Sequence, residues 1–496
     1  MIKIYNTQTR QKEKFQSLEL GKIGMYVCGP TVYNYIHIGN ARTFISFDVI
    51  RRYLEWRGFK VTFVQNITDV DDKIIKKANE EGRTAAEVAE EYTKAFIDDM
   101  HKAGVKDPDI RPKATEEIPA MIELVEELIK GGHAYEVEGD VYFSVRSFPE
   151  YGKLSGRNID EMESGHRELR ADGQGIEDRK RDPLDFAVWK AAKPGEPSWD
   201  SPWGKGRPGW HIECSAMSRK YLGLPFDIHG GGADLVFPHH ENEVAQSEAA
   251  CGCTFANYWI HGGMLQINSE KMSKSLGNFL LLRDVLERTR PEVLRFLMLQ
   301  THYRSPLDFS DERLAEAEAG LSRIENTVKN LEWAIENAQD IPSPLQTKPL
   351  MKQTKETRNE FIVAMDDDFN TAGALGIVFG FVNELNAQVA GKTVSITDVP
   401  CLRQAHAVVV ELMSVLGIMM GGAQEVSYPD AVVPLAKELA GYTGANPVQA
   451  VEVLLACRME ARKEKNWELA DKVRDGMKEL GLVIEDTPQG PRVSVE

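Results

Sequence analysis

Residues 22–65 read KIGMYVCGPTVYNYIHIGNARTFISFDVIRRYLEWRGFKVTFVQ, in which a strand, a helix and a second strand follow one another. The run from Lys22 to Cys28 predicts a buried strand, and residues 60–65 alternate enough to predict the next one. Residues 40–57 predict a helix, because apolar side chains recur on one side of it and Gly58 ends it. A strand–helix–strand unit of this kind builds a parallel sheet.

The chain has 496 residues, too many for one ordinary core, so several domains are expected. The sequence predicts an α/β protein with a Rossmann-like parallel-sheet domain that carries an insertion, followed by an α-helical bundle and a small α+β C-terminal domain. The expected bounds are 1–120 for the first half of the sheet domain, 121–205 for a Gly- and Pro-rich insertion, 206–310 for the second half, 311–425 for the bundle and 430–496 for the C-terminal domain.

Beyond Asp311 the pattern is helical, since apolar residues recur every three or four positions as far as Ile335. This spacing also fits a coiled coil, but the stripe is short and favours an intramolecular helix bundle. Residues 337–349 contain three prolines and predict a connection between helices. Near the end of the chain, the pattern predicts a helix that ends at Gly481 and two short strands around the turn 486–490.

The formal net charge is −17, which argues against nonspecific nucleic-acid binding but leaves room for a local RNA site. The start of the chain lacks a secretory signal, and no apolar run is long enough to cross a bilayer. Six cysteines show no disulfide framework, so we expect a reducing cytoplasm. These features argue against membrane and secreted disulfide-rich proteins and leave the activity open.

The motif His37-Ile38-Gly39-Asn40 stands between the first predicted strand and the helix. Backbone N–H groups and the helix dipole favour a phosphate there, and the imidazole and amide donors of His37 and Asn40 suit triphosphate oxygens. A motif this short is weak alone, because many turns before helices look similar.

A second motif, Lys271-Met272-Ser273-Lys274-Ser275, is more specific. Its two ammonium groups and two hydroxyls suit a polyphosphate whose charge moves during a reaction. The alternative is a solvated surface loop. The neighbouring Gly277-Asn278 would let such a loop move, which is a hypothesis of gating.

Together the two motifs resemble the HIGH and KMSKS signatures of class I aminoacyl-tRNA synthetases, with Asn40 in place of the second histidine. The residues around Cys28, Cys214 and His239 are similar to those of the cysteinyl-tRNA synthetase family, and the resemblance covers nearly the whole chain. It implies an enzyme that joins L-cysteine to tRNA(Cys) through a cysteinyl-adenylate, with Mg²⁺ accompanying ATP. The family pattern assigns catalysis to His37, Asn40, Lys271 and Lys274, and ATP binding to Gly39, Gly232, Asp234, Met272, Ser273 and Ser275.

Cys28, Cys214, His239 and Glu243 are candidate metal ligands, although they lack a compact zinc-finger spacing. Cys28 ends a strand, where ligands of parallel sheets collect, and His239 and Glu243 share one helix face. Thiolate, imidazole and carboxylate all bind zinc. The alternative is that both cysteines are simply buried. The resemblance implies one Zn²⁺ per chain on these four residues, with His240 as the nearest rival to His239 and with Cys251-Gly252-Cys253 structural.

In this reading the metal selects cysteine over serine, which differs from it by one atom. An apolar pocket favours one such amino acid over the other by only about 1–3 kcal/mol of binding free energy. Accurate translation requires roughly 10⁴-fold discrimination, which corresponds to about 5.5 kcal/mol. A thiolate bonds strongly to zinc, while a hydroxyl keeps its proton. By resemblance Thr68, Trp210 and His229 line the cysteine pocket, although a buried Trp or His is ordinarily part of a core. The insertion looks too small and Gly-rich for an editing domain.

The C-terminal domain carries basic residues and Trp467, which suit phosphates and an unpaired base. Interleaved acidic residues equally fit a solvated helix face. By resemblance Arg462, Trp467, Asp471 and Asp486 face the anticodon. The expected partners are tRNA(Cys), ATP and L-cysteine, with no membrane, and the expected form is a cytoplasmic monomer. Two rivals remain: a cysteine ligase to an aminosugar, as in mycothiol synthesis, which lacks the terminal domain, and a non-catalytic zinc- and RNA-binding relative.

Overall fold

The computed structural model describes residues 1–158, 179–267, 270–271, 279–420, 428–487 and 490–495. The chain packs as two compact units. The first comprises Met1–Leu321, Glu360–Gly376 and Val415–Ile418, and the second comprises Ser322–Asn359, Ile377–Ser414 and Met419–Glu496. Three pieces of the region 311–425, namely 311–321, 360–376 and 415–418, therefore pack with the first unit.

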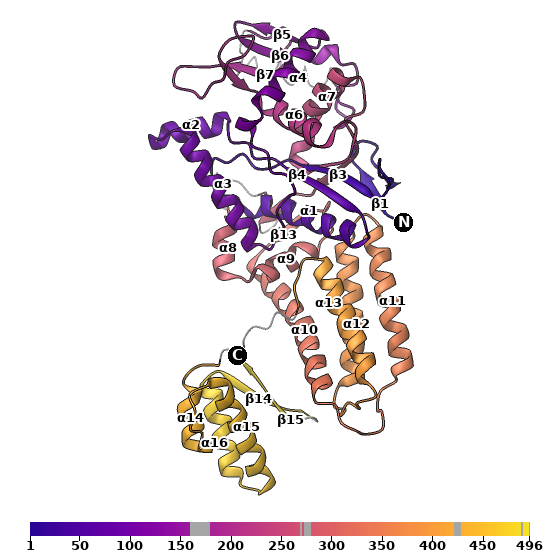
Figure 1. Ribbon diagram of the computed structural model, residues 1–496, viewed down its shortest axis with the longest axis vertical. Coiled ribbons are helices and arrows are strands. Elements are labelled where there is room, and N and C mark those ends of the chain that lie inside the picture. The colour runs from indigo at the N-terminus through magenta and orange to yellow at the C-terminus, as the bar shows by residue number, and fades with distance from the viewer. Residues whose placement is uncertain (159–178, 268–269, 272–278, 421–427, 488–489, 496) are drawn as a thin grey trace. The chain divides into compact units, whose positions relative to one another are not determined.

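A parallel sheet lies at the centre of the first unit (Figure 1). Its order is β10 (Ala256–Gly262), β9 (Phe226–Gly232), β3 (Lys22–Val27), β4 (Lys60–Gln65). The connection from β3 to β4 is α1 (Ile38–Trp56), whose predicted apolar face is buried. The strand–helix–strand unit and the α/β fold are therefore confirmed.

The insertion contains α4 (Ile118–Lys130) and an antiparallel sheet of four strands, β5 (Ala134–Val137), β6 (Asp140–Phe143), β7 (Phe186–Ala191) and β8 (Gly206–Pro208). The sequence pattern does not indicate this sheet, because strands of three to six residues in charged, Gly-rich sequence have little periodicity. Buried side chains of these strands join the core around Cys28 and Cys214. α6 (Trp210–Leu222) and α7 (Glu241–Cys251) then lead back to the parallel sheet.

Shorter elements complete the first unit. Strands β1 (Lys3–Asn6) and β2 (Gln11–Lys14) pair as a hairpin, and α2 (Asp72–Glu81) and α3 (Ala85–Lys102) follow β4. Strand β11 (Leu265–Ile267) pairs with β12 (Glu270–Lys271) and β13 (Leu307–Phe309). Helices α8 (Leu282–Arg288) and α9 (Pro291–Leu299) lie between β12 and β13 in the chain, and short turns of 3-10 or π helix cover Ala114–Glu116, Val145–Ser147, Ala233–Leu235 and Val236–His240.

The region 311–425 forms the predicted helices, α10 (Asp311–Glu336), α11 (Thr347–Asp366), α12 (Thr371–Val389) and α13 (Val399–Val415). Within the second unit, Asn386 Nδ2 donates to Thr327 Oγ1 at 2.9 Å and ties α12 to α10. α11 begins before Pro349, earlier than predicted. A proline fits there, because the first N–H groups of a helix have no partner within it.

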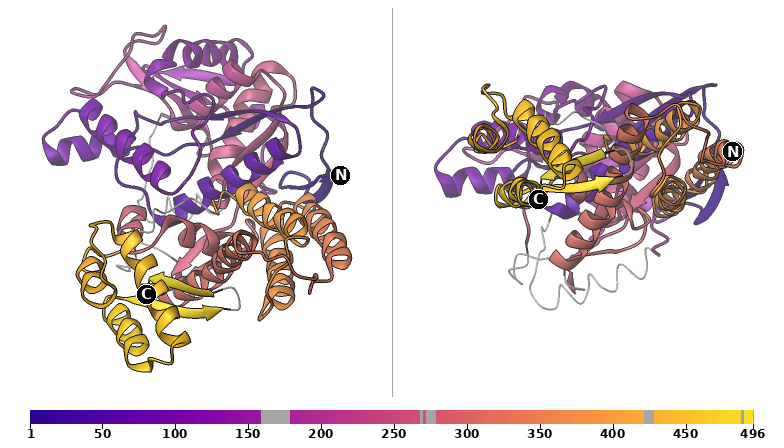
Figure 2. Two further views of the ribbon diagram at one scale, coloured as in Figure 1. Left: turned by 60° about the horizontal axis from the view of Figure 1, so that its bottom comes forward. Right: turned by 90° about the horizontal axis from the view of Figure 1, so that it is seen from below.

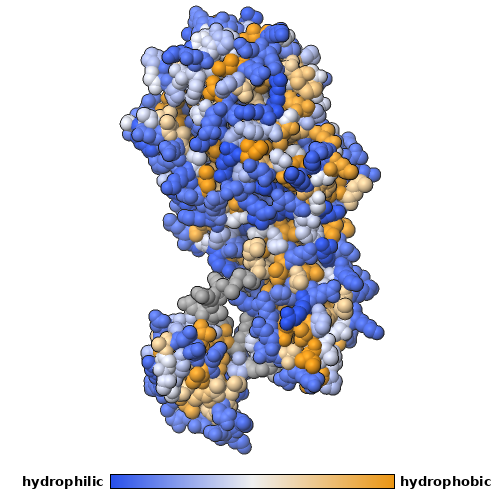
Figure 3. Space-filling view, viewed as in Figure 1, coloured by the Kyte–Doolittle hydropathy of each residue, from blue (hydrophilic) through white to orange (hydrophobic). Residues whose placement is uncertain are grey.

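The end of the chain folds as α14 (Val432–Ala440), α15 (Pro447–Lys463), α16 (Trp467–Glu479) and the hairpin β14 (Leu482–Thr487) with β15 (Gly490–Val495). The hairpin lies beside these helices (Figure 2). Gly481 has a φ of 73°, which favours glycine where α16 gives way to β14. The face drawn in Figure 3 is mostly hydrophilic. No helix among the described residues is long and apolar enough to cross a membrane.

Candidate metal and nucleotide site

The carboxyl end of the parallel sheet gathers the four predicted metal ligands. Cys28 directly follows β3, and its N–H donates to the Gly230 carbonyl on β9 at 3.2 Å. α6 contributes Cys214, α7 contributes Glu243, and the turn before α7 contributes His239. All four side chains are buried.

The ligand atoms of these four residues lie within 4.8 Å of one another. Cys28 Sγ is 3.6 Å from Cys214 Sγ and 3.5 Å from Glu243 Oε1, and His239 Nε2 is 3.0 Å from the same oxygen. With ordinary bond lengths, tetrahedral zinc needs about 3.8 Å between two sulfurs and about 3.3–3.6 Å between other donor pairs. The spacing of the donors therefore fits zinc. Only the distance between His239 Nε2 and Glu243 Oε1 would have to increase slightly.

A second group of potential ligands, Cys28, His229, His240 and Glu243, overlaps with the first. His240 Nε2 is 3.2 Å from Cys28 Sγ, so this histidine is a structural rival to His239. The first group has two sulfur donors and the second has one. Moreover, His229 Nε2 is 2.8 Å from Glu243 Oε2, which suits an outer partner that orients the carboxylate.

The electrostatics of the cluster favour a cation at its centre. Burial opposes ionisation of Glu243, but His229 and His239 lower the pKa of its carboxyl to about 2. Burial also opposes the charged form of His239, yet Glu243 and Cys214 raise its pKa to about 10. Burial opposes ionisation of Cys214 too, but hydrogen bonds from Cys28 and His239 lower its pKa to about 6. The cluster therefore carries a net negative charge, which favours a metal cation, and His239 would release its proton on binding one.

The predicted cysteine-pocket residues lie next to this cluster. Trp210 is the first residue of α6, and its ring centroid is 4.2 Å from that of His239. His229 lies on β9 and contacts Glu243. Thr68 follows β4 and is 2% exposed. The structure therefore brings the pocket and metal candidates together.

His37 is the N-cap of α1. Its Nδ1 accepts the Asn40 N–H at 3.2 Å, and Asn40 Oδ1 accepts the His37 N–H at 3.4 Å. The asparagine that replaces the second histidine of the motif thus completes a reciprocal capping box. Gly39 lies in the same first turn, at a helix N-terminus that suits an anion.

The glycine run is the end of β9 rather than a loop. A Cβ on Gly230 would lie 2.2 Å from Phe47 Cε1, so close packing on α1 requires this glycine. Gly232 ends the strand, and Asp234 follows in an exposed turn. Lys271 ends β12. The predicted residues Met272, Ser273, Lys274 and Ser275 lie outside the described residues, as do Gly277 and Asn278.

The structure joins two of the four predicted anticodon residues. Asp486 accepts from Arg462 at 2.7 Å and from Arg458 at 2.7 and 3.0 Å. These hydrogen bonds, that of Arg458 foremost, lower the pKa of the Asp486 carboxyl to about 2. Trp467 begins α16 and is 57% exposed. Asp471 lies on the same helix and pairs with a neighbouring arginine.

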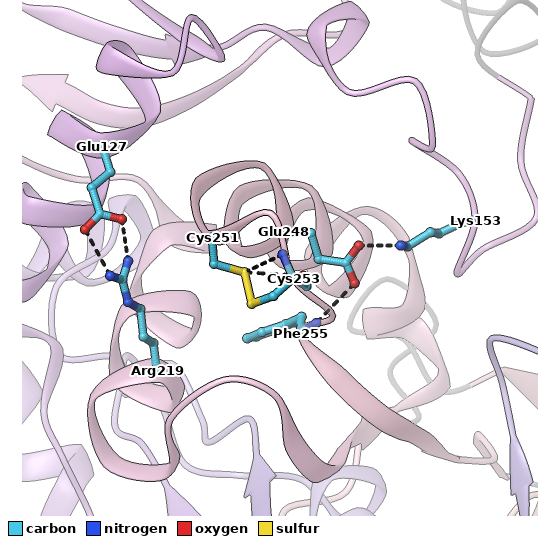
Figure 4. Close-up of a disulfide and its surroundings, with 7 residues drawn as sticks. All are labelled: Glu127, Lys153, Arg219, Glu248, Cys251, Cys253 and Phe255. Atoms are coloured by element: carbon cyan, nitrogen blue, oxygen red, sulfur yellow. Dashed lines mark hydrogen bonds and ion pairs between the residues drawn. A yellow bond between two sulfur atoms is a disulfide. The ribbon is translucent and has the colours of Figure 1, made fainter.

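Cys251 and Cys253 form a disulfide at the end of α7 (Figure 4). The expectation that the cysteines form no disulfide is wrong for this pair, whose spacing fits free thiols equally well. Gly252 between them has a φ of 64°, which lets the chain reverse there. One turn earlier, Glu248 pairs with Lys153. The paired sulfurs offer no thiolate to a metal.

Two further histidines at the site are not singled out by the sequence. His211 Nδ1 is 2.9 Å from His239 Nδ1, and His261 Nε2 is 2.8 Å from His240 Nδ1. His211 lies three residues before Cys214, on the same side of a helix, which is a signal that the sequence does offer. His261 is the next-to-last residue of β10, among mostly apolar residues, and offers no such signal.

Comparison with known proteins agrees with this geometry. Residues 14–319 match the family model of the tRNA synthetases class I (C) catalytic domain, and residues 360–420 match the DALR domain. The cysteine–tRNA ligase of Pelotomaculum thermopropionicum is 52% identical over 494 residues, covering 99% of each chain. That of Desulforamulus reducens is 50% identical, with the same coverage.

Solved structures of low identity share the fold. Mycobacterium tuberculosis methionyl-tRNA synthetase in complex with methionyl-adenylate has a TM-score of 0.58 at 15% identity, covering 80% of this chain and 90% of that chain. An Agrobacterium radiobacter LeuRS in a ternary complex with tRNA and LeuAMS has a TM-score of 0.58 at 11% identity, covering 82% and 87%. On the strength of the full-length relatives and the matched catalytic domain, the chain belongs to the cysteine–tRNA ligase family of class I aminoacyl-tRNA synthetases.

Proposed function

We propose that the chain joins L-cysteine to tRNA(Cys) at the expense of ATP, through a cysteinyl-adenylate. One observation carries this proposal. Four buried potential metal ligands, two of them sulfur atoms, meet at the carboxyl end of the parallel sheet, and α1 with its N-terminal His37 motif begins at the same end. Family membership supports the reaction class, and the sulfur-rich donor set supports a thiol substrate.

Cys28, Cys214, His239 and Glu243 would hold one Zn²⁺, and His229 would orient Glu243 through its second oxygen. When bound, the ion supplies a Lewis acid that prefers a thiolate to a hydroxyl. The protein itself holds the four donors in place and excludes water by burying them. Trp210, Thr68 and His229 would line the pocket for the rest of the amino acid.

In the first step, a carboxylate oxygen of cysteine attacks the α-phosphorus of Mg·ATP, and pyrophosphate leaves. In the second, the terminal ribose hydroxyl of tRNA attacks the adenylate carbonyl, and AMP leaves. Positioning and charge stabilisation are sufficient for both steps, so no nucleophilic side chain is required. His37, Asn40, Lys271 and Lys274 would stabilise the phosphates, and Gly39, Gly232, Asp234, Met272, Ser273 and Ser275 would complete the ATP site.

Residues 430–496 would bind the anticodon through Arg462, Trp467, Asp471 and Asp486. An exposed tryptophan can stack on an unpaired base, and arginine can hold phosphate. We further propose a cytoplasmic monomer. The aminosugar-ligase alternative is less favourable, because that branch lacks such a terminal domain, whereas a folded one is present here.

Exchange of pyrophosphate into ATP tests the activation step. The full chain should catalyse this exchange only with cysteine present, whereas a non-catalytic relative shows none. Cys214→Ser should lose zinc and exchange together, while Cys251→Ser, outside the cluster, should keep both. Deleting residues 430–496 should abolish tRNA charging and spare exchange; loss of both would refute this division of labour.

A further inference from the structure

A chain of buried hydrogen bonds joins the loop after β3 to α6. The Gly29 N–H donates to Asn66 Oδ1 at 2.9 Å, Asn66 Nδ2 donates to Thr68 Oγ1 at 3.3 Å, and Thr68 Oγ1 donates to Glu213 Oε2 at 2.7 Å. The side chains of Asn66, Thr68 and Glu213 are at most 2% exposed. Glu213 immediately precedes the metal-cluster residue Cys214 on α6. The network therefore borders the proposed cysteine site.

The Gly29 N–H determines the directions of the two bonds that Asn66 makes. A backbone N–H can only donate, so the amide atom of Asn66 that faces Gly29 is the oxygen. The nitrogen of Asn66 must then face Thr68 and donate to its hydroxyl. That hydroxyl has one proton and two lone pairs, and the proton points to Glu213. One lone pair remains, so Thr68 can only accept a further hydrogen bond.

Glu213 has no evident structural task. Its Oε2 bonds Thr68, and its Oε1 has no hydrogen-bond partner among the described residues although it is buried. Burial, together with the neighbouring Cys214, raises the pKa of the Glu213 carboxyl well above its usual range, so a single neutral partner leaves this buried group costly to the fold. By contrast, the buried carboxylate of Glu117 bonds both Lys220 and Tyr221, also on α6. A costly group retained beside a substrate site indicates a role in recognition.

We propose that Glu213 and Asn66 are positioning residues that hold the Thr68 hydroxyl as an acceptor for the α-ammonium group of the amino acid. The network then recognises the ammonium end of cysteine, while the metal cluster recognises the sulfur end. An acceptor-only hydroxyl suits an ammonium group, which can only donate, and does not suit the substrate's carboxylate, which can only accept. This inference rests on the proposed function and adds a determinant of substrate orientation to it.

Two substrate fragments test this inference as competitive inhibitors of cysteine-dependent pyrophosphate exchange. 3-Mercaptopropionate keeps the thiol and carboxylate but lacks the ammonium, and cysteamine keeps the thiol and ammonium. In Glu213→Gln and Thr68→Val, cysteine KM and cysteamine Ki should rise about 10–100-fold, the range for one hydrogen bond to a charged group. The Ki of 3-mercaptopropionate should stay within about 3-fold. Equal weakening of both inhibitors would overturn the inference.

A double mutant separates positioning from direct contact. If Glu213 acts through Thr68, the double variant Glu213→Gln/Thr68→Val should be no weaker for cysteine than Thr68→Val alone; multiplied effects would overturn the positioning role. Thr68→Ser should restore cysteine KM to within about 3-fold, because it keeps the hydroxyl. Asn66→Asp, which replaces the donating amide by an acceptor, should weaken cysteine as Glu213→Gln does, and unchanged KM would remove Asn66 from the network.

Stability provides the matched control. Glu213→Gln should melt at or above the wild-type temperature with one zinc per chain, whereas Glu117→Gln should melt lower and keep the cysteine KM. A destabilised Glu213→Gln with unchanged inhibitor selectivity would show a purely structural role and overturn the inference. Wild-type enzyme without cysteine-dependent exchange would instead refute the proposed function itself.

Discussion

Replacing Arg42 by methionine should destabilise the catalytic unit strongly. Arg42 lies on α1 and is 2% exposed, and Nη1 donates to the carbonyls of Gly263 at 2.9 Å and Met264 at 2.8 Å. Its Nη2 donates to the carbonyls of His302 and Ser305. These four carbonyls precede β11 and β13, so one guanidinium fixes the start of both strands of the small sheet that also contains β12.

The expected magnitude follows from opposing contributions. Four hydrogen bonds from a charged donor stabilise by roughly 6–12 kcal/mol in sum. Removing the buried guanidinium also removes its desolvation cost, which is several kcal/mol. Burial lowers the pKa of Arg42 to about 10, which reflects this cost. The free energy of unfolding should therefore fall by about 3–5 kcal/mol. Pyrophosphate exchange should also slow, because β12 ends at Lys271.

Urea unfolding followed by circular dichroism measures this change, and Arg219→Met is the matched control. Arg219 forms a bidentate pair with Glu127 at 2.6 and 2.9 Å, but both side chains are about one-third exposed (Figure 4). An exposed pair of this kind contributes about 1 kcal/mol or less. If Arg42→Met lost no more stability than Arg219→Met, the structural role of these four carbonyl bonds would be refuted.

Chelation of zinc should abolish cysteine-dependent pyrophosphate exchange, as Cys214→Ser does, and zinc addition should restore it; exchange that persists without zinc would contradict the metal's role. Gly230→Ala should lower the melting temperature because its Cβ would meet Phe47 at 2.2 Å, whereas Gly376→Ala, with no atom within 4 Å, should not. The ionised Asp486 carboxylate stabilises the folded C-terminal domain through its arginine contacts. This stabilisation is complete above the ordinary carboxyl pKa of 3.8 and is lost as the pH falls from 3.8 through the folded-state pKa of about 2. Hydrogen exchange of β14 should therefore speed up over that interval, and Asp486→Asn should remove the dependence; an unchanged dependence would assign it to another group.

The elements that the sequence predicts well are those with strong periodicity or a clear end signal. α1 follows its predicted range closely because Gly58 stops it and its apolar face is regular. The antiparallel sheet of the insertion cannot be predicted from the sequence. Strand β8 has only three residues, and tertiary packing rather than local pattern determines how the strands pair. Likewise, the pattern alone shows no reason for Cys251 and Cys253 to bond.

The site divides in the same way. Residues within signatures, such as His37 and the segment around His239, are recognisable because their order along the chain is itself the signal. Asn66 and Glu213 belong to no signature, and nothing in a single sequence separates a buried recognition residue from an ordinary polar one. Their roles emerge only from which atoms face each other across α6 and the sheet.

The four candidate metal ligands lie far apart in the sequence, so they are synthesised at different times during translation. Cys28 precedes Glu243 by 215 positions, so at about 5–20 residues per second a ribosome needs on the order of 10–40 s to deliver the last donor after the first. For the first 186 of those positions Cys28 is the only one of the four donors that has been synthesised, because Cys214 is the next of them along the chain. A metal that needs all four donors would therefore bind only after these segments of the chain have come together.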